Sequence, residues 1–228
     1  MTAQYQYSDE DWSTCFERLH LHIPLTDEMR GSLQRYVEQL HRWNQPYHLL
    51  GPAALPDLLT RHIVDSASLW SLLPESCIIA DIGSGAGLPG MVLAILSTPD
   101  RQFHLFEANQ KKARFLNFVV SELKLSNRVA VHKVRVEESK NFLGIFDVTI
   151  CRAVANLESV ARLTRSLLKL EGVCLAMKGK RVQGELTQFS HGKQARYFLT
   201  PVVHPSNFGG EGVIVELRYV SRETGEGT

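Results

Sequence analysis

Four glycines and an acidic residue lie close together in one segment of this chain. The segment begins with an apolar run that ends in Asp81-Ile82, and an apolar helical run follows it from Met91. Between these runs lie Gly83, Gly85, Gly87 and Gly90. The order strand, glycine-rich turn and helix predicts a cofactor site of the nucleotide type, because glycines allow a tight turn and a close approach of the backbone to a ligand.

Asp81 separates the cofactor classes that such a loop could serve. Gly85, Gly87 and Gly90 also satisfy the Gly-x-Gly-x-x-Gly pattern of dinucleotide sites, but a dinucleotide would bring its pyrophosphate close to a carboxylate of the same sign. S-adenosylmethionine has no phosphate and carries a sulfonium and an ammonium. Asp81 and Gly85 are therefore predicted to belong to an S-adenosylmethionine site. A nicotinamide-dependent oxidoreductase and a tight loop without ligand are the alternatives.

Two further segments that follow predicted strands are candidates for binding the nucleoside part of the cofactor. Glu107 ends the second strand, where its carboxylate could accept hydrogen bonds from both ribose hydroxyls. Val136 and Glu137 follow the third strand, and the Val136 N–H and the Glu137 carboxylate could meet the adenine ring. In each case the alternative is an acid that is simply exposed to solvent.

Two cations follow the fourth and fifth predicted strands. Arg152 comes directly after an apolar strand, where a guanidinium needs a partner to offset its desolvation. We expect it to bind the methionine carboxylate of the cofactor, with an RNA phosphate as the alternative. Lys178 has the same position after the next strand, and His62 and Asp65 are three residues apart on a predicted helix, where a local bond is commonest. His62, Asp65 and Lys178 are the candidates for substrate contact.

The chain also has one cluster of basic residues, and its histidines and cysteines can be checked for metal-binding spacing. Lys111, Lys112 and Arg114 lie in the first part of a predicted helix, where the helix dipole disfavours cations. They could bind RNA phosphate or form a solvated face. The 9 histidines and 4 cysteines show no cluster with metal-ligand spacing, so no metal is expected.

The elements that must position these residues alternate along the chain. Strands are predicted at about 77–82, 102–107, 128–133, 145–151 and 172–178, with helices between them at about 89–97, 109–124 and 156–170. Asn109 and Asn156 are the expected N-caps of the last two helices, and Gly172 is the expected stop. This alternation predicts an α/β fold with a mostly parallel, twisted, doubly wound sheet. Strands at about 196–203 and 212–220, joined through 207–210, would form a C-terminal hairpin that adds one antiparallel strand.

The first third of the chain is predicted to be helical. Thr26 is a good N-cap, and apolar residues recur about every four residues from there to about Trp43. A second helix is predicted at about 55–73 and a shorter one at about 9–21. We therefore expect a helical N-terminal extension (1–74) packed on a methyltransferase domain (75–221), with a flexible tail at 222–228.

Composition limits the class of protein. The chain has 228 residues, enough for one α/β domain with an appended segment, and its formal net charge is only +1, so a nucleic acid must meet a local basic face. No apolar run approaches the roughly 18 residues that span a membrane, and the N-terminus has neither the basic start nor the apolar core of a signal peptide. The cysteines form no Cys-x-x-Cys pair, so we expect buried, reduced thiols in a cytoplasmic protein.

These motifs together resemble the glucose-inhibited division protein B family, the bacterial 16S rRNA guanine-N7 methyltransferases. The resemblance runs in family order over about residues 26–220, through Arg61-His62-Ile63-Val64-Asp65-Ser66, the loop from Asp81 to Gly90, Arg135-Val136-Glu137-Glu138, Cys151-Arg152-Ala153 and Lys178-Gly179. The chain departs from the usual pattern at three places, where the family has Asn-Leu-Thr for His48-Leu49-Leu50, often Asp for Glu107, and Ser for Cys151.

The resemblance implies a Rossmann-like class I methyltransferase fold and S-adenosylmethionine as the methyl donor. It implies that N7 of guanine 527, in the 530 loop of 16S rRNA, is the target. Carried over by position, the residues that bind the cofactor would be Gly83, Leu88, Val136, Glu137 and Arg152. The partner is then 16S rRNA or the small ribosomal subunit, and we expect a monomer that needs no membrane and no metal.

The implied chemistry agrees with the lack of an obvious general base. Guanine N7 has a free lone pair and loses no proton when it is methylated, so catalysis would rest on proximity and orientation. Two other functions remain open. One is an S-adenosylmethionine-dependent methyltransferase of another RNA, a protein or a small molecule, which would share the cofactor residues. The other is a non-catalytic RNA-binding module, against which the complete cofactor loop argues.

Overall fold

The computed structural model describes residues 6–17, 23–179, 182–205 and 212–220, and the strands of this part form one sheet in the order β3-β2-β1-β4-β5-β7-β6. The strands are β1 (Cys77–Ile82), β2 (Arg101–Phe106), β3 (Val129–His132), β4 (Phe146–Arg152), β5 (Leu168–Lys178), β6 (Val202–Pro205) and β7 (Val213–Arg218). Strands β1 to β5 are parallel, and β7 is antiparallel to both of its neighbours. The predicted sheet, including its antiparallel strand, is confirmed, whereas the predicted turn at 207–210 and the tail at 222–228 lie outside the described residues.

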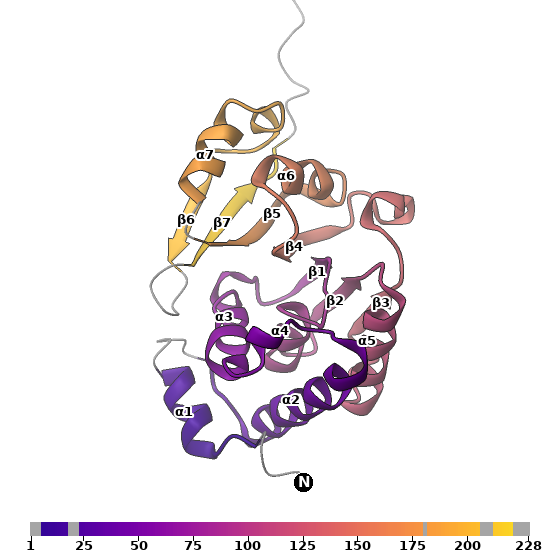
Figure 1. Ribbon diagram of the computed structural model, residues 1–228. Helices are drawn as coiled ribbons and strands as arrows, with labels where there is room; N and C mark the ends of the chain where they lie inside the picture. The colour runs from indigo at the N-terminus through magenta and orange to yellow at the C-terminus, as the bar shows by residue number, and fades with distance from the viewer. Residues whose placement is uncertain (1–5, 18–22, 180–181, 206–211, 221–228) are drawn as a thin grey trace, which may run out of the picture.

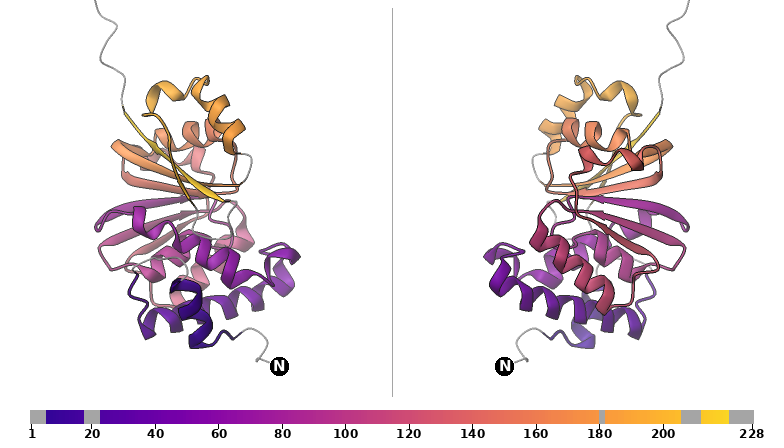
Figure 2. Two further views of the ribbon diagram at one scale, coloured as in Figure 1. Left: turned by 90° about the vertical axis from the view of Figure 1, so that its left-hand side faces the viewer. Right: turned by 90° about the vertical axis from the view of Figure 1, so that its right-hand side faces the viewer.

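Helices cover both faces of this sheet (Figures 1 and 2). On one face lie α1 (Asp9–Glu17), α2 (Asp27–Tyr47), α3 (Val64–Ala67), α4 (Gly90–Leu96) and α5 (Gln110–Glu122), and on the other lie α6 (Leu157–Arg165) and α7 (Val182–Ser190). Short 3-10 helices lie at Pro52–Ala54, Trp70–Leu72, Val136–Glu138, Lys140–Phe142 and Ala195–Tyr197. The predicted N-caps are confirmed, since Thr26, Asn109 and Asn156 each accept a hydrogen bond from the first turn of their helix. No helix of the described residues is both long and apolar enough to span a membrane.

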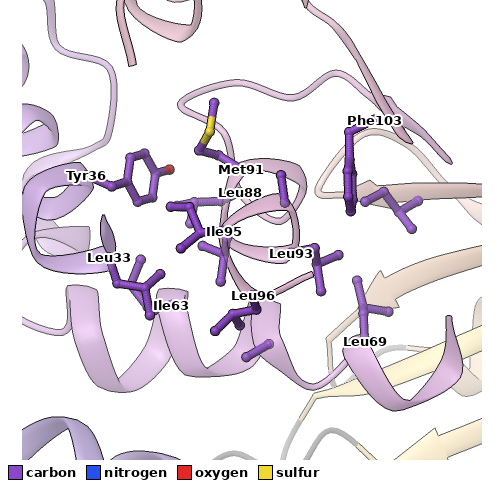
Figure 3. Close-up of a cluster of buried hydrophobic side chains, with 14 of the residues drawn as sticks. Leu33, Tyr36, Ile63, Leu69, Leu88, Met91, Leu93, Ile95, Leu96 and Phe103 are labelled. Carbon is purple, nitrogen blue, oxygen red and sulfur yellow. The ribbon is translucent and has the colours of Figure 1, made fainter. Parts of the chain in front are cut away.

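The N-terminal helices supply one of the two layers of the hydrophobic core. All seven residues of α4 are buried, and Figure 3 shows side chains of α2, among them Leu33 and Tyr36, gathered against Met91 and Ile95 of α4. The other layer forms between the sheet and helices α6 and α7, around residues such as Phe189. All four cysteines are free and buried, as expected.

The predicted helix at 55–73 is wrong as a single element. A π-helix at Leu58–Ile63 leads into the four residues of α3, and a 3-10 turn follows. Serine side chains compete with the helical hydrogen bonds here, since Ser66 Oγ donates to the His62 carbonyl and Ser68 Oγ to the Asp65 carbonyl, both at 2.6 Å. A π-turn rotates the residues that follow it and is frequent at functional sites.

The C-terminal third departs from the predicted boundaries. Helix α6 ends at Arg165 and β5 begins at Leu168, so Gly172 does not end a helix. It lies inside β5, where the register with β4 shifts and where an added Cβ would come within 3.2 Å of the Asp147 carbonyl oxygen. The strand predicted at 196–203 is reduced to β6, because the chain first curls into the 3-10 turn at Ala195–Tyr197. Helix α7 was not predicted, and Phe189 is its only buried residue.

Candidate cofactor and substrate site

The glycine-rich loop connects β1 to α4 at the point where the strand order reverses, because β1 pairs with β2 on one side and β4 on the other. Gly83, Gly85 and Gly87 all have positive φ. At Gly85 (φ +57°), the nearest atom to an added Cβ is the Gly83 carbonyl oxygen, 3.8 Å away, so this side of the loop is open. Open backbone beyond the carboxyl ends of parallel strands, beside such a reversal, is where ligands bind in α/β sheets.

The Glu107 side chain links the end of β2 to this loop. Its Oε2 atom accepts a 2.8 Å hydrogen bond from the Gly85 N–H, and its Oε1 atom accepts one of 2.7 Å from the Asn109 N–H. Glu107 is 9% exposed. The predicted contact with ribose hydroxyls stays a prediction, but the carboxylate lies directly beside Gly85.

Asp81 lies beneath the loop and is only 1% exposed. Its Oδ2 atom accepts a 3.0 Å hydrogen bond from the Gly90 N–H at the start of α4. An added Cβ at Gly90 would lie 2.5 Å from the same oxygen, which explains the glycine there. Burial, together with the nearby charge of Glu107, raises the pKa of Asp81 to about 7, although the hydrogen bond from Gly90 and the nearby Ser84 hydroxyl oppose the shift.

Two buried polar atoms near the loop have no hydrogen-bond partner among the described residues. They are Oδ1 of Asp81 and Nη1 of Arg152. Their strands are neighbours, since Ile82 pairs with Cys151, one residue before Arg152. One atom suits a cation and the other an anion, so a zwitterionic amino-acid group such as the methionine end of S-adenosylmethionine fits the pair.

The remaining predicted cofactor residues lie around the same end of the sheet. Leu88 is buried in the loop, and Gly83 is exposed at its start. Val136 is buried and packs in the same apolar cluster as Phe106 of β2, whereas Glu137 is exposed. The predicted contact of Val136 and Glu137 with adenine stays a prediction.

The three predicted substrate residues and Arg152 meet at a hollow of about 820 Å³. His62 and Asp65 line it from the π-helix and α3, and Arg152 and Lys178 line it from the ends of β4 and β5. The hollow borders the cofactor loop at Val154, whose Cγ2 atom lies 3.2 Å from the Cβ position of Gly83. Residues far apart in the sequence are thus brought to one wall.

Arg152 joins the two sides of this hollow. Its Nη2 atom contacts Nδ1 of His62, and its Nη1 atom lies 3.9 Å from Oδ2 of Asp65. The predicted local bond between His62 and Asp65 is replaced by this shared partner. Burial and the charge of Arg152 lower the pKa of His62 to about 4, so the ring is neutral near pH 7.

Lys178 is held by its surroundings and is not solvated. Its Nζ atom lies 2.8 Å from Oε2 of Glu185 and also contacts the Ala155 carbonyl oxygen, and its side chain is 9% exposed. Glu185 Oε2 in turn accepts a 3.0 Å hydrogen bond from the N–H of Leu157, the first residue of α6. Lys178 and Glu185 therefore fasten α6 and α7 to the end of β5 and shape the hollow.

Two surface features of the predicted site have simple structural explanations. Asn109 accepts hydrogen bonds from the N–H groups of Lys111 and Lys112, and the Lys111 ammonium lies 5.9 Å from the ring centroid of Tyr47, which is 39% exposed. His48, at the family departure, is the left-handed C-cap of α2 (φ 49°). Asparagine and histidine are both enriched in this backbone conformation, so the exchange keeps the helix end.

Sequence reasoning missed two residues that shape the site. Tyr36 of α2 is fully buried and donates a hydrogen bond to the Ala86 carbonyl in the loop. Glu185 comes from the helix that was not predicted. No local pattern marks either contact, because each joins residues far apart in the chain. Within the described residues, no group of three His, Cys, Asp or Glu side chains could hold a metal ion.

Known proteins are similar to this chain in sequence. A family model described as rRNA small subunit methyltransferase G matches residues 29–205. The chain is 39% identical over 171 residues to the ribosomal RNA small subunit methyltransferase G of Halorhodospira halophila, covering 75% of this chain and 78% of the relative. It is 39% identical over 197 residues to the protein of the same name from Beutenbergia cavernae, covering 85% and 91%.

Solved structures share the fold. A methyltransferase from Geobacter sulfurreducens aligns with a TM-score of 0.56 at 14% identity, covering 92% of this chain and 96% of that one. The TYW2 protein of P. horikoshii, in complex with MeSAdo, aligns with a TM-score of 0.57 at 12% identity, covering 75% and 65%. At such identities the likeness supports the fold alone.

Proposed function

Since the chain belongs to the rRNA small subunit methyltransferase G family, we propose that it transfers a methyl group from S-adenosylmethionine to N7 of a guanine in 16S rRNA, namely guanine 527 in the 530 loop. The family makes the chain an rRNA methyltransferase. The methyl donor, the atom and the position are our proposal. The observation that carries it is the shared border of the open cofactor loop and the hollow at Gly83 and Val154, which lets a donor and a base meet.

The residues around the loop fit the proposed donor. When bound, S-adenosylmethionine supplies an electrophilic methyl group on its sulfonium. Arg152 would hold the carboxylate and Asp81 the ammonium, each through an atom that has no hydrogen-bond partner among the described residues. Glu107 would lie beside the ribose, with Val136 and Glu137 at the adenine, and Gly83, Gly85 and Leu88 would form the floor.

The chain need supply no general base for this reaction. Guanine N7 attacks through a free lone pair, so no proton must leave in the methyl-transfer step. His62, the most obvious candidate base beside the hollow, has its lone pair at Nδ1 directed to Arg152. The protein would instead hold the base in line with the donor and exclude water, which makes proximity and orientation the main source of rate.

The proposal extends to the setting of the reaction. We place the protein in the cytoplasm as a monomer that meets 16S rRNA within the small ribosomal subunit and needs no metal. Lys111, Lys112 and Arg114 form no ion pair with the described residues and could contact RNA phosphates beside the loop.

A direct chemical test exists for the methylated atom. Borohydride followed by aniline cleaves RNA at 7-methylguanine. We expect 16S rRNA from a strain without this gene to lose one cleavage site, and purified protein with S-adenosylmethionine to restore it. An unchanged cleavage pattern would show that the target assignment is wrong.

A further inference from the structure

The hollow beside the cofactor loop is the place where the target base would be distinguished from other bases, so this inference rests on the proposed function. Its volume of about 820 Å³ is within the range of small-molecule sites and holds a purine with room to spare. Enzymes that modify a base act on it in a single strand or after it is flipped out of a duplex, and they recognise the unstacked base in a pocket. The question is which side chain reads it.

Most donors that line the hollow are already engaged. Lys178 contacts Glu185 and the Ala155 carbonyl. The Arg61 side chain is 68% exposed and lies 3.5 Å from Asp57, in an arrangement too open to fix a base. The guanidinium of Arg152 lies between His62 and Asp65 and is the proposed partner of the cofactor. His62 is the remaining side-chain donor in the described lining of the hollow.

Arg152 fixes the tautomer of the His62 ring. A guanidinium has no acceptor, so the Nδ1 atom that contacts it must accept the hydrogen bond. Burial and the Arg152 charge keep the ring neutral near pH 7. A neutral imidazole with an acceptor at Nδ1 carries its proton on Nε2. Among the described residues, His62 forms hydrogen bonds through Nδ1 and through its main-chain carbonyl, and no acceptor is paired with the Nε2–H.

Guanine and adenine differ in the exocyclic group at C6, which lies next to N7 on the major-groove edge of the base. Guanine presents the O6 acceptor there, whereas adenine presents an amino group that can only donate. We propose that the Nε2–H of His62 donates a hydrogen bond to O6 of the target guanine while N7 faces the cofactor loop, and that His62 thereby excludes adenine. With adenine, the Nε2–H would face the amino group, so two donors would meet and neither would gain an acceptor in place of water.

The test removes one group from each side of the proposed bond. 16S rRNA is assembled by splinted ligation so that the target position carries either guanine or 2-aminopurine, which keeps N7 but lacks O6. The kcat/KM of methyl transfer is measured for the native protein and for His62→Phe. We expect the native preference for guanine to exceed that of the variant by roughly ten- to a hundredfold. If the substitution also shifts the Arg152 side chain, the kcat/KM values of both RNAs change by the same factor, and this factor cancels in their ratio.

Further variants separate this role from a structural one. His62→Gln restores a neutral donor and should recover part of the preference for guanine. His62→Leu repeats the comparison made with His62→Phe, so the result does not depend on whether one variant folds. His191→Phe, an exposed histidine after α7, should leave the preference unchanged. If the native protein, His62→Phe and His62→Leu all prefer guanine over 2-aminopurine equally, the assignment is wrong. If the native protein methylates N7 of neither RNA, the proposed function itself is wrong, and the assignment is lost with it.

Discussion

The hydroxyl of Tyr36 donates a 2.7 Å hydrogen bond to the main-chain carbonyl of Ala86, and the two residues are 50 positions apart. Tyr36 belongs to the N-terminal helix α2, and Ala86 lies in the middle of the cofactor loop. Both are buried, at 0% and 3% exposure. The conformation of the loop is therefore held from outside the strand–turn–helix unit that contains it.

Tyr36→Phe should weaken cofactor binding. The Ala86 carbonyl would stay buried without its donor, at a cost of about 1–3 kcal/mol in the free energy of unfolding, and a loosened loop should bind S-adenosylmethionine several-fold more weakly. Calorimetry and urea unfolding measure the two effects. Tyr7→Phe is the matched control, because Tyr7 is a partly buried tyrosine that packs against Trp12 of α1 and not against the loop. Equal affinity in all three proteins would show that the loop does not depend on this bond.

Gly85→Val should abolish cofactor binding through the space that it fills. The new side chain would stand on the open side of the loop, and the positive φ adds about 1–2 kcal/mol of strain. Gly144→Val carries a similar strain, because Gly144 has φ +64° and nothing within 4 Å of its Cβ position. We expect both variants to lose stability but only Gly85→Val to lose S-adenosylmethionine binding in calorimetry. Normal binding by Gly85→Val would move the site elsewhere.

Arg152→Ala should weaken S-adenosylmethionine binding roughly ten- to a hundredfold in the absence of RNA, because a charged hydrogen bond contributes about 1.5–3 kcal/mol. Arg152→Lys should recover only part of the affinity, since an ammonium cannot form two parallel bonds to a carboxylate. An alanine variant that binds the cofactor normally but fails to methylate RNA would place Arg152 on the substrate side.

Asp81 should make the stability of the ligand-free protein depend on pH. Its folded pKa of about 7 exceeds the ordinary 3.8, so the folded protein holds this proton more tightly than the unfolded chain. The stabilisation is complete below about pH 4 and is lost as the pH rises through about 7. Urea unfolding across this range should show the decline in the native protein relative to Asp81→Asn, whose amide oxygen can still accept from Gly90. Parallel curves would contradict the assignment. Because a bound ammonium favours the carboxylate, S-adenosylmethionine affinity should rise over the same interval.

Methylation should proceed without a metal cofactor. Ribosomal particles need Mg²⁺ themselves, so the assay uses naked 16S rRNA and protein stripped with a chelator. We expect full activity after removal of zinc and other transition metals. Activity that returns only with added zinc would point to a ligand set beyond the described residues.

Local signals explain what the sequence could predict. Strand β1 was predicted with its observed ends because it is a buried apolar run followed directly by glycines. The Asn109 cap marked the start of α5 for a similarly local reason, since its side chain accepts from the next turn. The parallel direction of β1 to β5 followed from the alternation of strands and helices. The order of the strands in the sheet was not part of that prediction.

What failed depends on contacts between distant residues or on competing hydrogen bonds. The helix at 55–73 has suitable apolar spacing, but Ser66 and Ser68 bond to carbonyls of the preceding turn and the helix becomes irregular. The spacing of His62 and Asp65 in the sequence predicts a bond between them, whereas the fold brings Arg152 to both. The roles of Tyr36 and Glu185 depend wholly on such tertiary contacts.

Helix α4 is buried along its whole length, with no residue left to face solvent. If the residues before β1 were removed, apolar side chains of α4 that they now cover would be exposed to water. We therefore expect a truncated chain beginning near residue 75 to aggregate instead of folding autonomously, and the intact protein to unfold in a single cooperative transition. The N-terminal segment would then be indivisible from the catalytic unit, and a protease cut between α2 and β1 would inactivate the enzyme even though every predicted cofactor residue lies beyond the cut.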